Sequence, residues 1–169
     1  MISSENSSVN NKDLKEDEPL KIILAEDDND DQELFMDAVD ATNVPAEIIT
    51  VGNGEELVNT LKDDSETKPD IIFIDINMPV KGGKEALAEI KNDKELKDIP
   101  AVMLSTSNSP KDIEDTLNKG ADLYIQKPSS FKGFILILKK VFVLYWTKAL
   151  INPLKNMFFI SENNISRED

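Results

Sequence analysis

Hydrophobic residues along this chain fall into two alternating patterns. Short apolar runs rich in β-branched residues indicate strands, and longer segments with a one-sided apolar stripe indicate helices. The expected strands are Leu20–Ala25, Ala46–Val51, Ile71–Ile74, Ala101–Leu104 and Leu123–Ile125. The helical patterns between and after them lie at about 31–42, 55–63, 84–92, 111–119 and 131–147. Five such pairs with short connections predict a parallel sheet with helices on both faces.

Some of the expected helices carry start signals. Asn53 with Glu56, and Ser109 with Asp112, have the spacing of a capping box. Pro110 follows Ser109 and suits the first position of a helix, where its missing N–H costs nothing. These signals support the helix boundaries that the apolar pattern gives.

Polar residues follow four of the five expected strands. They are Glu26-Asp27-Asp28 after the first, Asp75 and Asn77 after the third, Ser105-Thr106 after the fourth, and Lys127-Pro128 after the fifth. Each group alone has an ordinary explanation as a cap, a turn or a solvated surface. The carboxyl ends of parallel strands meet at one edge of a sheet, which is where open α/β sheets bind ligands. Their coincidence therefore predicts a site there.

Composition narrows the chemistry of that site. The chain has 169 residues, enough for one well-cored domain with tails, and a formal net charge of −14 that argues against a nucleic-acid partner. Cysteine and histidine are absent, which excludes thiolate chemistry, Ser-His nucleophiles and His-ligated zinc. Carboxylate, hydroxyl, amide and lysine groups remain, and they suit a hard cation such as Mg²⁺.

The ends of the chain differ from its body. Residues 1–18 are polar and lack the apolar core of a signal peptide, so we expect a disordered leader of a cytoplasmic protein, followed by a domain over 19–148. Residues 149–169 form a tail that is apolar at first and polar at its end. The apolar run 134–146 carries lysines and is too short to span a bilayer, so no membrane association is expected.

From about Leu20 to Trp146 the chain resembles a response-regulator receiver domain, the phosphoryl-accepting part of two-component signalling. The matching motifs are Ile23-Leu24-Ala25-Glu26-Asp27, Asp75-Ile76-Asn77-Met78-Pro79 with Gly82-Gly83, Leu104-Ser105-Thr106, and the run from Gly120 to Lys127-Pro128. The resemblance implies a flavodoxin-like, doubly wound (βα)5 fold with strand order 2-1-3-4-5.

The resemblance also implies a metal site. Asp27 and Asp75 would give carboxylate oxygens to Mg²⁺ (or Mn²⁺), and the backbone carbonyl of Asn77 would give a third ligand. Glu26 would hold a metal-bound water. The family more often has Asp at that position, and we expect the longer side chain to be tolerated.

For phosphoryl chemistry, the resemblance makes Asp75 the nucleophile that forms an acyl phosphate. The Ser105 hydroxyl and the Lys127 ammonium would bind phosphoryl oxygens. Tyr124 matches the family's switch aromatic, although a half-buried strand tyrosine is an equally good reading of the residue alone. By the same resemblance we expect a cis peptide bond between Lys127 and Pro128, which would aim the lysine into the site.

Three functions compete. The first is a stand-alone response regulator, which a sensor histidine kinase or phosphotransfer protein phosphorylates and which signals by binding proteins. The second is a phosphohydrolase of the haloacid-dehalogenase type, disfavoured because Asn77 stands where that family needs an Asp and because the acidic pair comes first in the chain. The third is a degenerate receiver that binds partners without phosphorylation, against which the intact residue set argues.

Association is expected through the last helix. Beyond the one stripe that a sheet-covering helix needs, the segment has further apolar residues, namely Leu136, Ile137, Val143, Leu144 and Trp146. In receiver domains the fourth helix, fifth strand and fifth helix form the usual output face. We therefore expect a homodimer through that face with the tail 149–160 along its edge, or a monomer in which the tail covers the helix.

Overall fold

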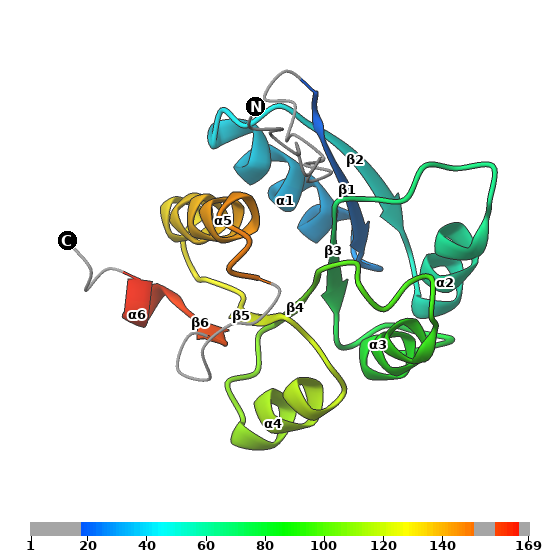
Figure 1. Ribbon diagram of the computed structural model, residues 1–169. Coiled ribbons are helices and arrows are strands. Elements are labelled where there is room, and N and C mark those ends of the chain that lie inside the picture. Colours follow the sequence, from blue (N-terminus) through cyan, green and yellow to red (C-terminus); the bar gives the residue numbers. More distant parts are fainter. Residues whose placement is uncertain (1–17, 151–157, 166–169) are drawn as a thin grey trace, which may run out of the picture.

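The computed structural model describes residues 18–150 and 158–165, and their strands form one parallel sheet (Figure 1). Residues 1–17 of the expected leader 1–18 and part of the tail lie outside the described residues. The strands are β1 Leu20–Ala25, β2 Ala46–Val51, β3 Ile71–Asp75, β4 Ala101–Ser105, β5 Leu123–Gln126 and β6 Phe159–Ile160. Their order is β2-β1-β3-β4-β5-β6, which confirms the expected order 2-1-3-4-5 and adds a strand that the sequence pattern did not predict.

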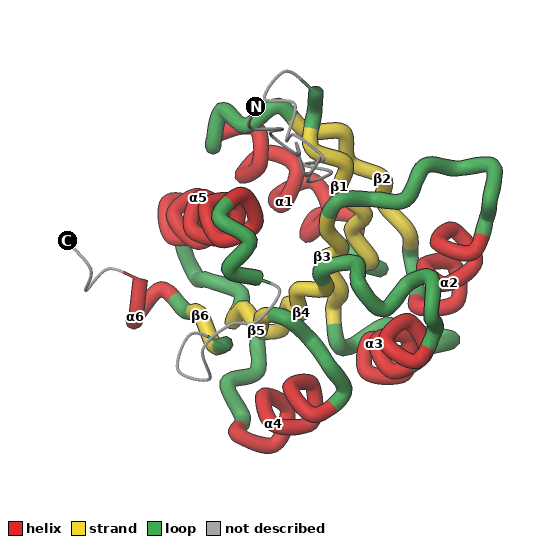
Figure 2. The backbone as a smooth tube through the Cα atoms, in the orientation of Figure 1, coloured by secondary structure: helices red, strands yellow, loops and turns green. Residues whose placement is uncertain are grey.

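Helices cover both faces of the sheet, α1 and α5 on one side and α2, α3 and α4 on the other (Figure 2). Their bounds are α1 Asn29–Ala41, α2 Gly54–Lys62, α3 Gly83–Asn92, α4 Pro110–Asn118, α5 Phe131–Trp146 and α6 Glu162–Ile165. The expected caps are present, with the Glu56 amide donating to Asn53 Oδ1 at 2.9 Å. Within the described part of the chain, none of the helices combines the length and apolar character that a bilayer crossing requires.

The central strand β3 is buried on both faces. Ile71, Ile72, Phe73 and Ile74 each have an exposed fraction of 0%. Because strand side chains alternate, Phe73 packs toward α1, where its ring centroid lies 4.9 Å from that of Phe35, and Ile72 and Ile74 join the opposite core. This two-sided anchoring fixes Asp75 at the carboxyl end of the strand.

The last helix is not covered all round. Ile137, Leu138 and Val141 of α5 are fully buried, but Leu136 and Val143 are 43% and 55% exposed. The described tail residues extend the sheet next to β5, where β6 runs parallel to it. They leave this outer stripe of α5 open.

Gly83 at the start of α3 packs against the end of β3. A Cβ at Gly83 would overlap the backbone carbonyl oxygen of Asp75, whereas a Cβ at Gly82 would lie an ordinary 3.5 Å from the Ile76 oxygen. We expect Gly83→Ala to lower the free energy of unfolding by about 1–3 kcal/mol, because backbone must move to relieve the overlap. Urea denaturation with Gly82→Ala as the matched control measures this, and equal stability of the two variants would contradict the packing described.

Candidate functional site

The polar residues that follow the strands converge at one edge of the sheet. Glu26 follows β1, Asp75 ends β3, Ser105 ends β4 and Lys127 follows β5. The Glu26, Asp75 and Ser105 residues are 2%, 6% and 1% exposed, so all three are taken out of water. The backbone fixes Lys127 as well, because its amide donates to the Ser105 carbonyl at 2.7 Å.

Lys127 joins the carboxylates of this edge. Its Nζ lies 2.8 Å from Glu26 Oε2 and 2.8 Å from Asp75 Oδ2. A longer contact of 3.3 Å reaches Asp31 Oδ2 in the first turn of α1. Burial by itself would lower the pKa of Lys127, but the hydrogen bonds with Asp75 and Glu26 outweigh it and raise that pKa. The lysine is therefore a firmly held cation between two strand ends.

The carboxyl group of Glu26 has a raised pKa at this crowded edge. Burial raises its pKa to about 7, and a hydrogen bond with Asp75 adds to the rise, while Lys127 and the Asp28 amide oppose it. The Asp28 N–H donates to Glu26 Oε1 at 3.1 Å. Burial therefore favours the protonated carboxyl group of Glu26 even beside Lys127.

Three carboxylates of the edge can share a cation. Glu26, Asp27 and Asp75 each offer an oxygen, and these atoms lie within 4.8 Å of one another. All the donors are hard oxygens and Asp27 is exposed, which fits the oxygen-rich, partly hydrated coordination that Mg²⁺ and Mn²⁺ take. A divalent cation bound there would favour the ionised form of Glu26, against the burial that raises the pKa of this carboxyl group.

Two nearby polar residues have other partners. Asp28 is exposed and caps α1 by accepting from the Asp31 amide at 2.9 Å. Asn77 is exposed, and its backbone N–H donates to Asp75 Oδ1 at 2.9 Å. Asp75 is thus held by Lys127 through one oxygen and by a backbone amide through the other, which orients its carboxylate.

Ser105 and Tyr124 are linked behind the site through Ser107. The Ser107 amide donates to Ser105 Oγ at 3.1 Å, and the Tyr124 hydroxyl donates to the Ser107 carbonyl at 2.8 Å. The exposed fraction of Tyr124 is 0%, and burial raises the pKa of its hydroxyl. The ring is therefore already turned inward.

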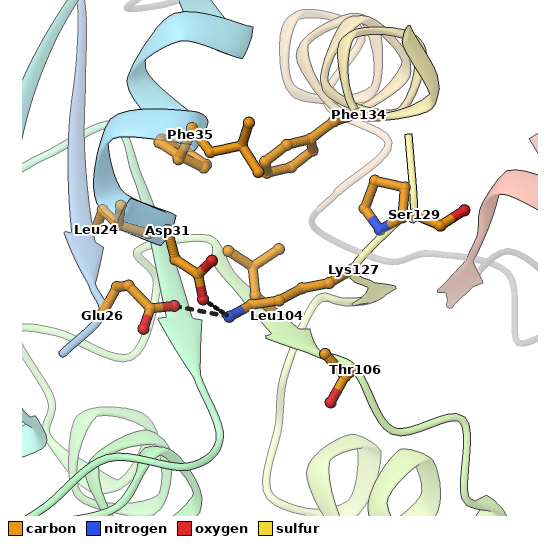
Figure 3. A pocket seen from close by; sticks show the side chains of 11 residues that line it. Leu24, Glu26, Asp31, Phe35, Leu104, Thr106, Lys127, Ser129 and Phe134 are labelled. Atoms are coloured by element: carbon orange, nitrogen blue, oxygen red, sulfur yellow. Dashed lines mark hydrogen bonds and ion pairs between the residues drawn. The ribbon is translucent and has the colours of Figure 1, made fainter. Parts of the chain in front are cut away.

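A cavity of about 350 Å³ opens beside the lysine (Figure 3). Phe35 and Phe134 line its apolar side, and Lys127 and Asp31 line its polar side. It lies between α1 and the connection that joins β5 to α5. An apolar group could thus be held next to the site's charges.

The sequence prediction of this edge misses one residue and adds one wrong feature. Asp31 contacts Lys127, and the only signal for it is a pair of acidic residues in the first turn of α1, Asp30 and Asp31. The described residues contain no cis peptide bond, so the expected cis bond between Lys127 and Pro128 is wrong. The lysine side chain reaches both carboxylates from a trans peptide, the form that X–Pro bonds intrinsically favour.

Comparisons with known proteins agree with this geometry. Residues 22–139 match the response regulator receiver domain family. The response regulator Rcp1 of Synechocystis sp. is 28% identical over 139 residues, which are 80% of this chain and 94% of that protein. The polar-differentiation response regulator DivK of Brucella anthropi is 31% identical over 121 residues, covering 72% of this chain and 94% of that protein.

Solved structures give the same result. The phosphorylated cyanobacterial phytochrome response regulator RcpA has a TM-score of 0.71 and 35% identity, covering 78% of this chain and 97% of that one. The Mn²⁺-bound form of Rcp1 has a TM-score of 0.67 and 26% identity, covering 81% of this chain and 98% of that one. The fold, the acidic edge with its lysine and the family match show that this chain belongs to the response regulator receiver domains of two-component signalling.

Proposed function

We propose that Asp75 is the phosphoryl acceptor of this response regulator. The observation that carries the proposal is the Asp75 carboxylate, buried at a central strand end and held between Lys127 Nζ and the Asn77 amide. Its oxygen would attack the phosphorus of a phosphohistidine, breaking the P–N bond. An acyl phosphate would form on Asp75, and the departing imidazole nitrogen would take up a proton.

The neighbours of Asp75 fit the needs of phosphoryl transfer, which depends on positioning and charge compensation. Mg²⁺ (or Mn²⁺), held by Asp27, Asp75 and the Asn77 carbonyl and through water by Glu26, would neutralise phosphoryl charge when bound. Lys127 would then serve the phosphoryl group as a cation and Ser105 as a hydroxyl donor. Apart from its own phosphorylation and loss of the phosphoryl group, we propose no turnover; the haloacid-dehalogenase alternative finds no support in the family match.

The partners we propose are proteins. A sensor histidine kinase or phosphotransfer protein would be the donor, in the cytoplasm. The target would bind the face formed by α4, β5 and α5, where β6 already pairs with the edge of β5. The exposed Leu136, Val143 and Trp146 on α5 support an apolar contact there, and a second copy of the chain is the partner we favour.

Asp75→Asn is expected to abolish phosphorylation and leave the fold intact, because the substitution is nearly isosteric and removes the nucleophile. The full chain is incubated with an acyl phosphate and Mg²⁺, and intact mass counts the added phosphoryl groups. Asp28→Asn is the matched control and should be labelled like wild type. Labelling of Asp75→Asn to the wild-type extent would rule out Asp75 as acceptor.

The raised pKa of Glu26, about 7, predicts a pH-dependent affinity for Mg²⁺. Below pH 7 the proton on Glu26 competes with the cation, so the affinity should fall by up to about tenfold per pH unit from this group. The proton also favours the folded chain below about pH 7, an effect that is lost as pH rises through that value. Calorimetric titrations with Mg²⁺ between pH 6 and 8 measure how the logarithm of the affinity changes with pH. The slope should be shallower for Glu26→Gln than for wild type or Asp28→Asn. Parallel slopes would mean that Glu26 does not titrate in this range.

Val143→Glu is expected to weaken self-association by at least about tenfold, because it places a charge in the apolar stripe of α5. Ile49→Glu is the matched control, since Ile49 is 50% exposed on β2 at the far edge of the sheet. Sedimentation equilibrium of phosphorylated protein measures both. A wild-type chain that stays monomeric at high concentration would exclude the dimer.

A further inference from the structure

The described C-terminal residues 158–165 contact the chain on both sides of Lys127. On the β5 side, β6 pairs with β5, and the Tyr124 amide donates to the Phe158 carbonyl at 2.8 Å. Phe158 is buried, only 2% exposed, and the Phe159 ring lies 5.9 Å from the Tyr124 ring. Tyr124, three positions before Lys127, is thus bound to residues 158–165, which we call the C-terminal strap.

On the other side of Lys127, Glu162 of the strap binds the start of α5. Its Oε2 accepts from the Ser129 amide at 2.9 Å and the Ser129 hydroxyl at 3.0 Å. Its Oε1 accepts from the Ser130 amide at 3.1 Å and from the Ser130 hydroxyl. These bonds lower the pKa of Glu162 to about 2, the Ser130 hydroxyl bond most and the Ser129 amide bond next. The carboxylate therefore stays ionised at the positive end of the helix.

Gly133 is a second, independent sign that this contact is built into the chain. It lies within the first turn of α5, where glycine is a poor helix former. A Cβ at this position would overlap Glu162 Oε1. Absence of a side chain at Gly133 thus makes the space that the carboxylate of Glu162 fills.

The residues between the two contacts include the lysine of the site. Lys127 lies three residues after Tyr124 and two before Ser129, and its Nζ reaches Glu26 and Asp75 at 2.8 Å. An ammonium on a flexible four-carbon side chain acts well only if its backbone is fixed. We infer that the C-terminal strap is a positioning element of the acceptor site, with Glu162 as the residue that fixes the Lys127-bearing connection.

This inference rests on the proposed function. Strap docking and phosphoryl binding must also affect each other reciprocally. If strap docking favours the arrangement of Lys127 that binds a phosphoryl group, a phosphoryl group must favour strap docking by the same factor. The carboxylates that would hold Mg²⁺ follow β1 and β3, away from the strap. Strap release should therefore weaken phosphoryl binding. It should not weaken Mg²⁺ binding, because a loosened Lys127 competes less with the cation for Glu26 and Asp75.

Two variants release the strap by different means. Glu162→Ala removes the carboxylate, and Gly133→Ala fills its space while improving the helix propensity of α5. Asn163→Ala is the matched control, an exposed strap residue next to Glu162. Hydrogen exchange at the Tyr124 amide reports docking directly, because that N–H donates to the strap's Phe158 carbonyl.

The full chain and each variant are titrated with Mg²⁺ alone and then with beryllium trifluoride anion, a phosphoryl mimic, in saturating Mg²⁺. We expect both releasing variants to exchange the Tyr124 amide about tenfold faster and to bind the anion about tenfold more weakly. Their Mg²⁺ affinity should equal that of wild type or exceed it, because Lys127 competes with the cation for Glu26 and Asp75. Wild type with the anion bound should exchange the Tyr124 amide more slowly than without it.

Several results would overturn the inference. One is faster Tyr124 exchange with unchanged anion affinity, and another is unchanged exchange in both variants. A parallel loss of Mg²⁺ affinity would show a general loss of structure in place of positioning. If wild type binds Mg²⁺ but no anion, the proposed function itself fails, and that outcome is distinct from wild type binding the anion with all variants equal to it.

Discussion

The ammonium of Lys127 between Glu26 and Asp75 is the interaction on which this edge of the molecule depends. It joins the ends of β1, β3 and β5, which are brought together by the sheet order but carry like charges on two of the three strands. Buried carboxylates need a paired cation, and removing one partner of a buried pair leaves an uncompensated charge. The lysine supplies that cation from within the chain. A bound divalent cation would take its place at the carboxylates, and Lys127 could then pair with a phosphoryl group.

A firm sheet makes such an arrangement tolerable. The apolar residues of β3 are fully buried between two helix layers, so Asp75 cannot move out to water without disrupting the core. Burial at this edge raises the pKa of Glu26, so its ionised form is disfavoured there. Concentrating the polar groups at one sheet edge leaves the rest of the core apolar, and the phosphorylation that we propose at Asp75 would take place there without unfolding the domain.

Much of the fold was predictable because long periodic segments carry strong signals. The five strands and their helices follow from apolar runs and caps, and Glu26, Asp75, Ser105 and Lys127 follow from their places at strand ends. Strand order came from the family resemblance, since periodicity does not encode it. The strand β6 has only two residues inside a longer apolar stretch, so no alternation distinguishes it. The contacts of Asp31 and Glu162 depend on long-range placement of single side chains, which a sequence pattern does not contain.

We propose that Lys127 is paired with the carboxylates of Glu26 and Asp75 until a phosphoryl group binds and becomes its partner. A crystal structure of the chain with Mg²⁺ and beryllium trifluoride anion tests it most directly. The predicted result is that the anion is bonded to an Asp75 oxygen, with Lys127 Nζ on a fluorine atom and no longer 2.8 Å from Glu26 Oε2. An anion bound elsewhere, or a Lys127 that keeps both carboxylate contacts while the anion sits on Asp75, would contradict the claim.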